Sequence, residues 1–268
     1  MRQVPVTNVR DFARFKQEHR KISIVTAYDA WSAHLVERSS VDAILVGDSA
    51  AMVMHGHRTT VPATVAMMAL HTAAVARAAG NKFVIADLPF LSYRNGVSSA
   101  LRAVAALMRS GAHAVKLEGV DGHEDVIRRI VGSGVPVMGH LGLTPQSVNE
   151  FGGFRVQGRD VEGAEKIARQ AHALAELGCF SLVLECIPAP LAARITRELT
   201  IPTIGIGAGP CTDGQVLVLQ DLWGVSGEHV PRFVRRYIDG ETMLTEALDR
   251  YDADVKGGQF PSTAESYS

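Results

Sequence analysis

The stretch HAVKLEGV, residues 113–120, decides the fold because it joins the composition of a buried strand to a charged end. Side chains alternate between the two faces of an extended strand, so Lys116 and Glu118 project to the same side. Strands that are apolar along almost their whole length are typical of a parallel sheet covered on both faces. This strand would therefore present a charge pair at one end of such a sheet.

Similar runs recur along the chain. They are KISIVTAYD (21–29), VDAILVGDS (41–49), KFVIADLPF (82–90), VPVMGHLGL (135–143), SLVLECIPA (181–189), IPTIGIGAG (201–209) and a weaker QVLVLQDLWG (215–224). Segments of helical periodicity lie between them, and several end at glycine, as helices commonly do. About eight alternating βα units predict an α/β fold, and a closed (β/α)₈ TIM barrel rather than an open sheet.

The domain organisation is expected to be simple. We find no linker in the sequence, which predicts a single barrel domain over 1–268 with a short N-terminal segment and a loose tail from about 256 to 268. Two connections, 50–62 and 144–160, are longer than usual between a strand and a helix. Loops of that length are often functional lids.

Composition and charge favour a small-molecule site. Hydrophobic residues make up 47% of the 268-residue chain, and 27 Lys and Arg nearly balance 28 Asp and Glu. A net charge of -1 gives no reason to expect a nucleic-acid or membrane partner. Three cysteines without paired spacing, and no apolar segment of membrane-span length, predict a soluble protein of the reducing cytoplasm.

Polar side chains end most of the predicted strands. In a parallel barrel all strand ends of one kind meet around one mouth, where such enzymes keep their active sites. We expect the following side chains to gather there: Asp48, Ser49, Asp87, Lys116, Glu118, His140 and Glu185.

Crowded carboxylates raise one another's pKa unless a cation lies among them. Mg²⁺ prefers oxygen ligands and commonly keeps several waters, so Asp48, Asp87 and Glu118 are candidate ligands, directly or through water. Zinc is disfavoured because neither a thiolate nor a His pair joins the set.

Each candidate also has a purely structural interpretation. Asp48 can cap the loop that follows it, and Asp87 can serve as a turn residue. Lys116 can pair with Glu118 as a structural ion pair. His140 can be a hydrogen-bonded core histidine without a catalytic role.

Sequence blocks spread over residues 5–250 resemble the ketopantoate hydroxymethyltransferase family, whose members are also called 3-methyl-2-oxobutanoate hydroxymethyltransferases. They are VTAYDA, VGDS, ADLPF, VKLEG, GHLGLTPQ, FGGFRVQGR, LECIPA and GIGAGPCTDGQVLVLQDLWG. The resemblance implies a barrel of the phosphoenolpyruvate mutase/isocitrate lyase type. It also implies a homo-oligomer, commonly a decamer of two pentamers.

The same resemblance implies an activity and residue roles. The reaction would transfer a hydroxymethyl group from 5,10-methylenetetrahydrofolate to α-ketoisovalerate, giving ketopantoate for pantothenate synthesis through a Mg²⁺-stabilised enolate. By motif, the metal ligands fall on Asp48, Asp87 and Glu118. The ketoacid contacts fall on Asp48, Ser49, Asp87 and Lys116. Glu185 would be the base. For His140 two roles stay open, help with proton transfer or only the ordering of residues around the site.

One departure from the family pattern concerns the loop after Ser49. The family usually reads GDSLGM where this chain reads GDSAAM, with Ala50 and Ala51. Because alanine resists positive φ, we expect the detail of this loop to differ.

Three other functions remain open on the sequence alone. A Mg²⁺-dependent lyase or mutase of the same barrel group would also form an enolate, although the chain lacks the KKCGH-like loop of those lyases. An aldolase could form a Schiff base on Lys116. A barrel without catalysis could serve as a scaffold or sensor.

Overall fold

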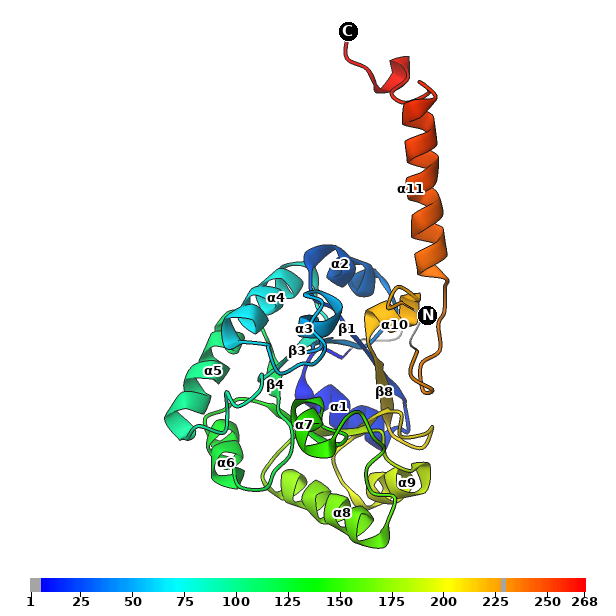
Figure 1. Ribbon diagram of the computed structural model, residues 1–268. Coiled ribbons are helices and arrows are strands. Elements are labelled where there is room, and N and C mark those ends of the chain that lie inside the picture. The colour runs from blue at the N-terminus through cyan, green and yellow to red at the C-terminus, as the bar shows by residue number, and fades with distance from the viewer. Residues whose placement is uncertain (1–5, 228–229) are drawn as a thin grey trace. The chain divides into compact units, whose positions relative to one another are not determined.

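The barrel predicted from the sequence is present in the computed structural model, which describes residues 6–227 and 230–268. Each strand pairs in parallel with the next, and β8 pairs back with β1 to close the ring (Figure 1). The strands are β1 (Ile22–Thr26), β2 (Ala43–Val46), β3 (Phe83–Asp87), β4 (Ala114–Lys116), β5 (Val137–Gly142), β6 (Ser181–Glu185), β7 (Thr203–Ile206) and β8 (Gly214–Leu217).

Helices surround this ring of strands in Figure 1. They are α2 (Ala30–Arg38), α4 (Val65–Ala78), α5 (Val97–Arg109), α6 (Glu124–Gly132), α8 (Val161–Glu176) and α9 (Ala189–Glu198). The last strand is shorter than predicted, because α10 (Leu219–Trp223) occupies the second half of the 215–224 run. This run has apolar residues at helical spacing, namely Leu219, Leu222 and Trp223. The spacing was overlooked because the run is mostly apolar and therefore also resembles a strand.

Helix α1 (Val9–Gln17) was not predicted, since its sequence is rich in charge. Asn8 begins it with a capping box, accepting a hydrogen bond from the Arg10 backbone while Asp11 accepts one from the Asn8 backbone. Its Phe12 and Phe15 are fully buried, in one apolar cluster with the beginnings of several strands. Helix α1 therefore closes the amino-terminal end of the barrel.

The barrel interior changes from apolar to polar along the strands. Ile85, Ala114, Met138 and Val183 belong to the apolar cluster. Two residues further on, and hence on the same face, come Asp87, Lys116, His140 and Glu185. Strand alternation thus places the predicted site residues in a polar layer stacked on the apolar one.

The two long connections contain short helices. Residues 50–62 include α3 (Ala50–Val53), and residues 144–160 include the 3₁₀ turn η1 (Pro145–Ser147) and α7 (Val148–Phe151). Neither Ala50 nor Ala51 has a positive φ, so the backbone at this departure from the family pattern does not require glycine.

The chain forms two compact units, one ending at Val218 and one comprising Leu219–Ser268. All eight barrel strands belong to the first unit, whereas α10, α11 (Gly240–Lys256) and η2 (Thr263–Glu265) belong to the second. A single domain over 1–268 with a loose tail stays a prediction. Over the described residues, no helix combines the length and apolarity needed to cross a membrane.

The aromatic cluster at the closed end of the barrel gives a stability prediction. Phe12 contacts Phe83 and Phe180 edge-on, with ring centroids 5.6 and 5.1 Å away. Phe12→Ala should lower the free energy of unfolding by about 3–5 kcal/mol, because it removes a fully buried ring and leaves a cavity. Urea denaturation of wild type and variant measures this difference in the free energy of unfolding. Leu70→Ala, at a 67% exposed position, is the control and should change little; equal losses would contradict the packing described.

Candidate active site

A buried ion pair joins two of the predicted residues. The register of β3 and β4 sets Asp87 beside Lys116, and Lys116 Nζ lies 2.9 Å from Asp87 Oδ1. Both residues are at most 4% exposed. Burial raises the pKa of Asp87, and the Lys116 charge opposes that rise. Burial lowers the pKa of Lys116, but the charges of Asp87, Glu118 and Asp48 outweigh it, so the ammonium persists.

Asp48 and Ser49 follow β2 and lie next to the Asp87–Lys116 ion pair. The Asp48 backbone N–H donates to Asp87 Oδ2 over 3.0 Å. Burial, and then the charges of Asp87 and Glu118, raise the pKa of Asp48 well above its usual value. Ser49 Oγ lies 2.8 Å from the hydroxyl of Tyr28, a fully buried residue whose pKa is raised by burial. Tyr28 therefore contacts Ser49 as a neutral phenol.

His140 lies between two carboxylates. Its Nδ1 is 3.5 Å from Glu118 Oε1, and its Nε2 is 3.2 Å from Glu185 Oε2. Burial and the Lys116 charge lower the pKa of His140, but the interactions with Glu118 and Glu185 prevail and raise it to about 9. With both ring nitrogens protonated, the 3.3 Å approach of Lys116 Nζ to His140 Nδ1 is a contact between two donors. The Lys116 ammonium is instead satisfied by Asp87.

Gly142 allows β5 and β6 to approach closely beside this site. Its φ is +96°, and a Cβ there would lie 2.2 Å from the Glu185 backbone oxygen. Any other residue would push Glu185 away from His140.

Sequence reasoning missed Gln146 and Tyr93. Gln146 Nε2 donates to Asp48 Oδ2 over 2.8 Å, and its backbone N–H donates to Glu118 Oε2 over 3.0 Å. The Tyr93 hydroxyl lies 2.9 Å from the Glu118 carbonyl oxygen and 3.2 Å from Gln146 Oε1. Gln146 belongs to the block GHLGLTPQ, which resembles the family pattern. Nothing in the sequence indicated that its side chain contacts Asp48.

The structure thus brings all seven predicted residues into one connected polar cluster. It contains four carboxylates, of Asp48, Asp87, Glu118 and Glu185, against two cations, Lys116 and protonated His140. With every group ionised the cluster carries a net charge of -2, which a divalent cation would balance.

Whether a metal fits this cluster depends on which carboxylate oxygens are available to bind it. Within residues 6–227 and 230–268, no group of three or more His, Cys, Asp or Glu side chains forms a ready metal cage. Asp87 Oδ1 and Glu118 Oε1 are nevertheless buried without a hydrogen bond, although each has a cationic group nearby. Magnesium commonly binds one or two carboxylates and fills its remaining positions with water or substrate oxygens. The donor set fits that mode, and the three ligand assignments stay predictions.

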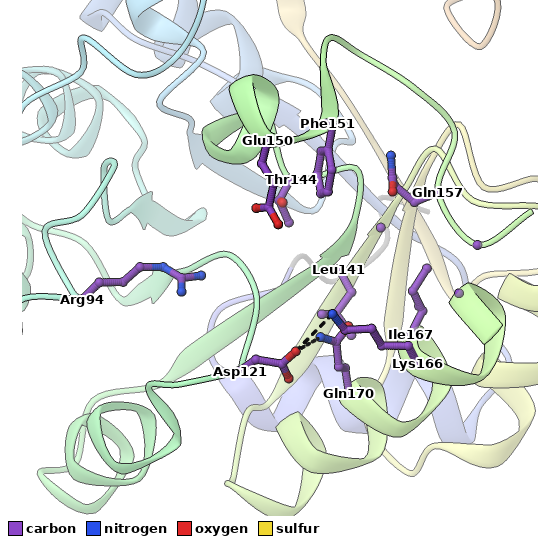
Figure 2. Close-up of a pocket in the computed structure, with 13 residues that line it drawn as sticks. Arg94, Asp121, Leu141, Thr144, Glu150, Phe151, Gln157, Lys166, Ile167 and Gln170 are labelled. Carbon is purple, nitrogen blue, oxygen red and sulfur yellow. Dashed lines mark hydrogen bonds and ion pairs between the residues drawn. The ribbon is translucent and has the colours of Figure 1, made fainter.

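A hollow of about 320 Å³ lies beside the cluster, between the 144–158 segment and α8 (Figure 2). Leu141 and Gly142 of β5 line it. Because Leu141 and His140 point to opposite faces of the strand, the hollow lies outside the barrel wall. Lys166 and Gln170 of α8 both contact Asp121 at its edge, and Arg94 enters from the connection after β3.

Comparison with known proteins identifies the relatives of this chain. A family model described as ketopantoate hydroxymethyltransferase matches residues 6–263. A 3-methyl-2-oxobutanoate hydroxymethyltransferase from Bdellovibrio bacteriovorus is 55% identical, over 97% of this chain and 99% of the relative. The protein of the same name from Coxiella burnetii (strain CbuG_Q212) is 53% identical, over 95% of this chain and 96% of the relative.

Solved structures with the same architecture are more distant in sequence. A phosphonopyruvate hydrolase, solved with oxalate and Mg²⁺, superposes with a TM-score of 0.62 at 13% identity, covering 98% of this chain and 92% of that one. A 2,3-dimethylmalate lyase of the PEP mutase/isocitrate lyase superfamily gives a TM-score of 0.60 at 16% identity, with the same coverage. These likenesses confirm the fold type predicted from the sequence.

The protonation of His140 can be measured directly. In metal-free protein, ¹⁵N NMR of the imidazole should show both nitrogens protonated at pH 7.5 and a midpoint of about 9, because the Glu118 and Glu185 carboxylates lie beside the two ring nitrogens. In the urea-unfolded chain histidines should titrate near the ordinary value of about 6.5. A midpoint below 7 for His140 in the folded protein would contradict this electrostatic description.

Proposed function

Because the chain belongs to the ketopantoate hydroxymethyltransferase family, we propose that it transfers a hydroxymethyl group from 5,10-methylenetetrahydrofolate to α-ketoisovalerate, giving ketopantoate for pantothenate synthesis. The observation that carries this proposal is the buried polar cluster with its excess of negative charge. It lies at the carboxyl ends of the strands, where barrel enzymes place their chemistry. Its members are the residues that match the family's motifs.

The cation proposed for this cluster is Mg²⁺, which Asp48, Asp87 and Glu118 would hold directly or through water. When bound, it would supply Lewis-acid stabilisation for the negative charge that develops on the keto oxygen of the substrate. The oxalate and Mg²⁺ of the phosphonopyruvate hydrolase structure support the same chemistry on a related barrel.

The ketoacid would be held by Ser49 and Lys116. The Ser49 hydroxyl can donate to the substrate carboxylate while it accepts from Tyr28, so its direction is fixed before the substrate arrives. The Lys116 ammonium, anchored by Asp87, adds positive charge beside the oxygens on which negative charge accumulates.

Glu185 is the proposed base that removes the C3 proton of the ketoacid. Its side chain is 15% exposed, more than the charged side chains around it, which are 3–5% exposed, so it is the charged group most accessible from outside. His140 Nε2 lies 3.2 Å from Glu185 Oε2, and this ion pair would orient the carboxylate for proton removal.

The hollow in Figure 2 is our proposed site for the folate donor. It adjoins the backbone of the residue that carries the base, since Gly142 lines it and packs against the Glu185 backbone oxygen. The carboxamides of Gln157 and Gln170 suit the hydrogen-bonding edge of a pterin, while Arg94 and Lys166 suit the carboxylates of the glutamate tail.

We also propose a cytoplasmic homo-oligomer, a decamer of two pentamers, without nucleic-acid or membrane partners. Support for oligomerisation comes from α11, where four apolar residues at helical spacing are each more than half exposed: Met243, Leu244, Leu248 and Tyr251.

Support for a reducing compartment comes from Cys179, Cys186 and Cys211, which are free thiols.

The activity and the role of Glu185 can be tested together. Purified protein should form ketopantoate from both substrates only with Mg²⁺, and should exchange the C3 proton of α-ketoisovalerate with D₂O. Glu185→Gln should slow that exchange by about 10²–10⁴-fold while ketoacid affinity changes little, because it removes a base and no proposed ligand. Glu162→Gln, at an exposed position of α8, is the matched control. Wild-type exchange in Glu185→Gln would remove this residue from the base role.

The predicted oligomeric state can be tested by measuring the mass of the protein in solution. Sedimentation equilibrium should give ten times the chain mass of 28.8 kDa. Leu244→Glu combined with Leu248→Glu on α11 should reduce it, because charges would replace the apolar contact. A monomer at micromolar concentration would contradict the decamer.

A further inference from the structure

Gln146 lies where the 144–160 connection meets the carboxylate cluster. It is 5% exposed, although it belongs to a connection with many exposed residues. Its side chain donates to Asp48 Oδ2 and to the Leu88 carbonyl oxygen, and its backbone N–H donates to Glu118 Oε2. One residue of the connection therefore bonds two of the three proposed metal ligands, which come from different strands.

The orientation of the Gln146 carboxamide follows from its neighbours. Nε2 faces a carboxylate oxygen and a backbone carbonyl, both of which can only accept when the carboxylate is ionised. Oε1 faces the Tyr93 hydroxyl, 3.2 Å away. The same hydroxyl donates to the Glu118 carbonyl oxygen 2.9 Å away, so it faces Gln146 as a donor. The amide thus points its donor toward Asp48.

Gln146 leaves room for a cation. It uses Oδ2 of Asp48 and Oε2 of Glu118, whereas the other Glu118 oxygen, Oε1, has no hydrogen bond and lies 3.5 Å from His140 Nδ1. A carboxylate offers about four lone-pair directions, so the amide donors and a metal can share one carboxylate without competing.

We propose that Gln146 is a positioning residue that couples cation binding to closure of the 144–160 connection over the site. This inference rests on the proposed function only in taking the cluster to bind a divalent cation. A cation fixes the Asp48 and Glu118 carboxylates, and fixed carboxylates make better acceptors for Gln146. By linkage, a closed connection must in turn strengthen cation binding by the same factor.

Hydrogen–deuterium exchange of full-length protein with Mg²⁺ alone tests the coupling without any turnover. In wild type, Mg²⁺ should slow exchange of the amides of residues 144–151 by at least about fivefold, the lower end of usual coupling strengths. Gln146→Met keeps the volume and the backbone bond to Glu118 but loses the donor to Asp48. Its Mg²⁺-dependent protection should fall below about twofold, and its Mg²⁺ dissociation constant should rise about tenfold, as for other residues that orient ligands.

Two further variants keep this test decisive. Asn149→Ala removes an exposed carboxamide from the same connection and should behave as wild type. Tyr93→Phe retains the ring but removes the hydroxyl that contacts Gln146 Oε1 and both backbone groups of Glu118, and should weaken both protection and Mg²⁺ affinity in the same direction as Gln146→Met. Undiminished protection in Gln146→Met, or faster exchange on adding Mg²⁺ to wild type, would overturn the coupling. Protein that shows the coupling but makes no ketopantoate would instead refute the proposed function.

Discussion

The constraint on which the site depends is the burial of more carboxylates than cations inside one barrel. Asp48, Asp87 and Glu118 are each at most 4% exposed, and burial, followed by the charges of the other two carboxylates, raises the pKa of Asp48. Stability alone does not explain such a cluster. Replacing buried ion pairs by apolar groups is often neutral or stabilising by about 1–4 kcal/mol, whereas removing one partner costs about 3–5 kcal/mol. The cation proposed for this cluster would account for its composition, because it would balance the excess of negative charge.

The rest of the fold holds this cluster in place. The apolar layer capped by α1 fills the closed end of the barrel, so the strands above it keep their register. That register sets Asp87 beside Lys116 and brings Glu185 level with Gly142. Residues outside the strands then add contacts: Tyr28, just after β1, bonds Ser49, and Gln146 of the 144–160 connection bonds Asp48 and Glu118.

The sequence predicted the barrel and the gathering of the seven polar residues because both follow from a short-range rule. An apolar strand with a polar end needs only alternation and parallel neighbours to place its last side chains around one mouth. Gln146 and Tyr93 could not be found this way, since their contacts cross between connections far apart in the chain. Helix α1 was missed because its two buried phenylalanines are diluted by charge, and the extent of the last strand was wrong because apolar composition alone does not distinguish α10 from a strand.

The location of a bound divalent cation tests this account most directly. Crystals soaked with Mn²⁺ and α-ketoisovalerate should give one strong anomalous peak per chain, within direct or water-mediated reach of the carboxylates of Asp48, Asp87 and Glu118, with the ketoacid beside Lys116 and Ser49. A Mn²⁺ site elsewhere in the chain, with those three carboxylates contacting neither metal nor metal-bound water, would contradict it.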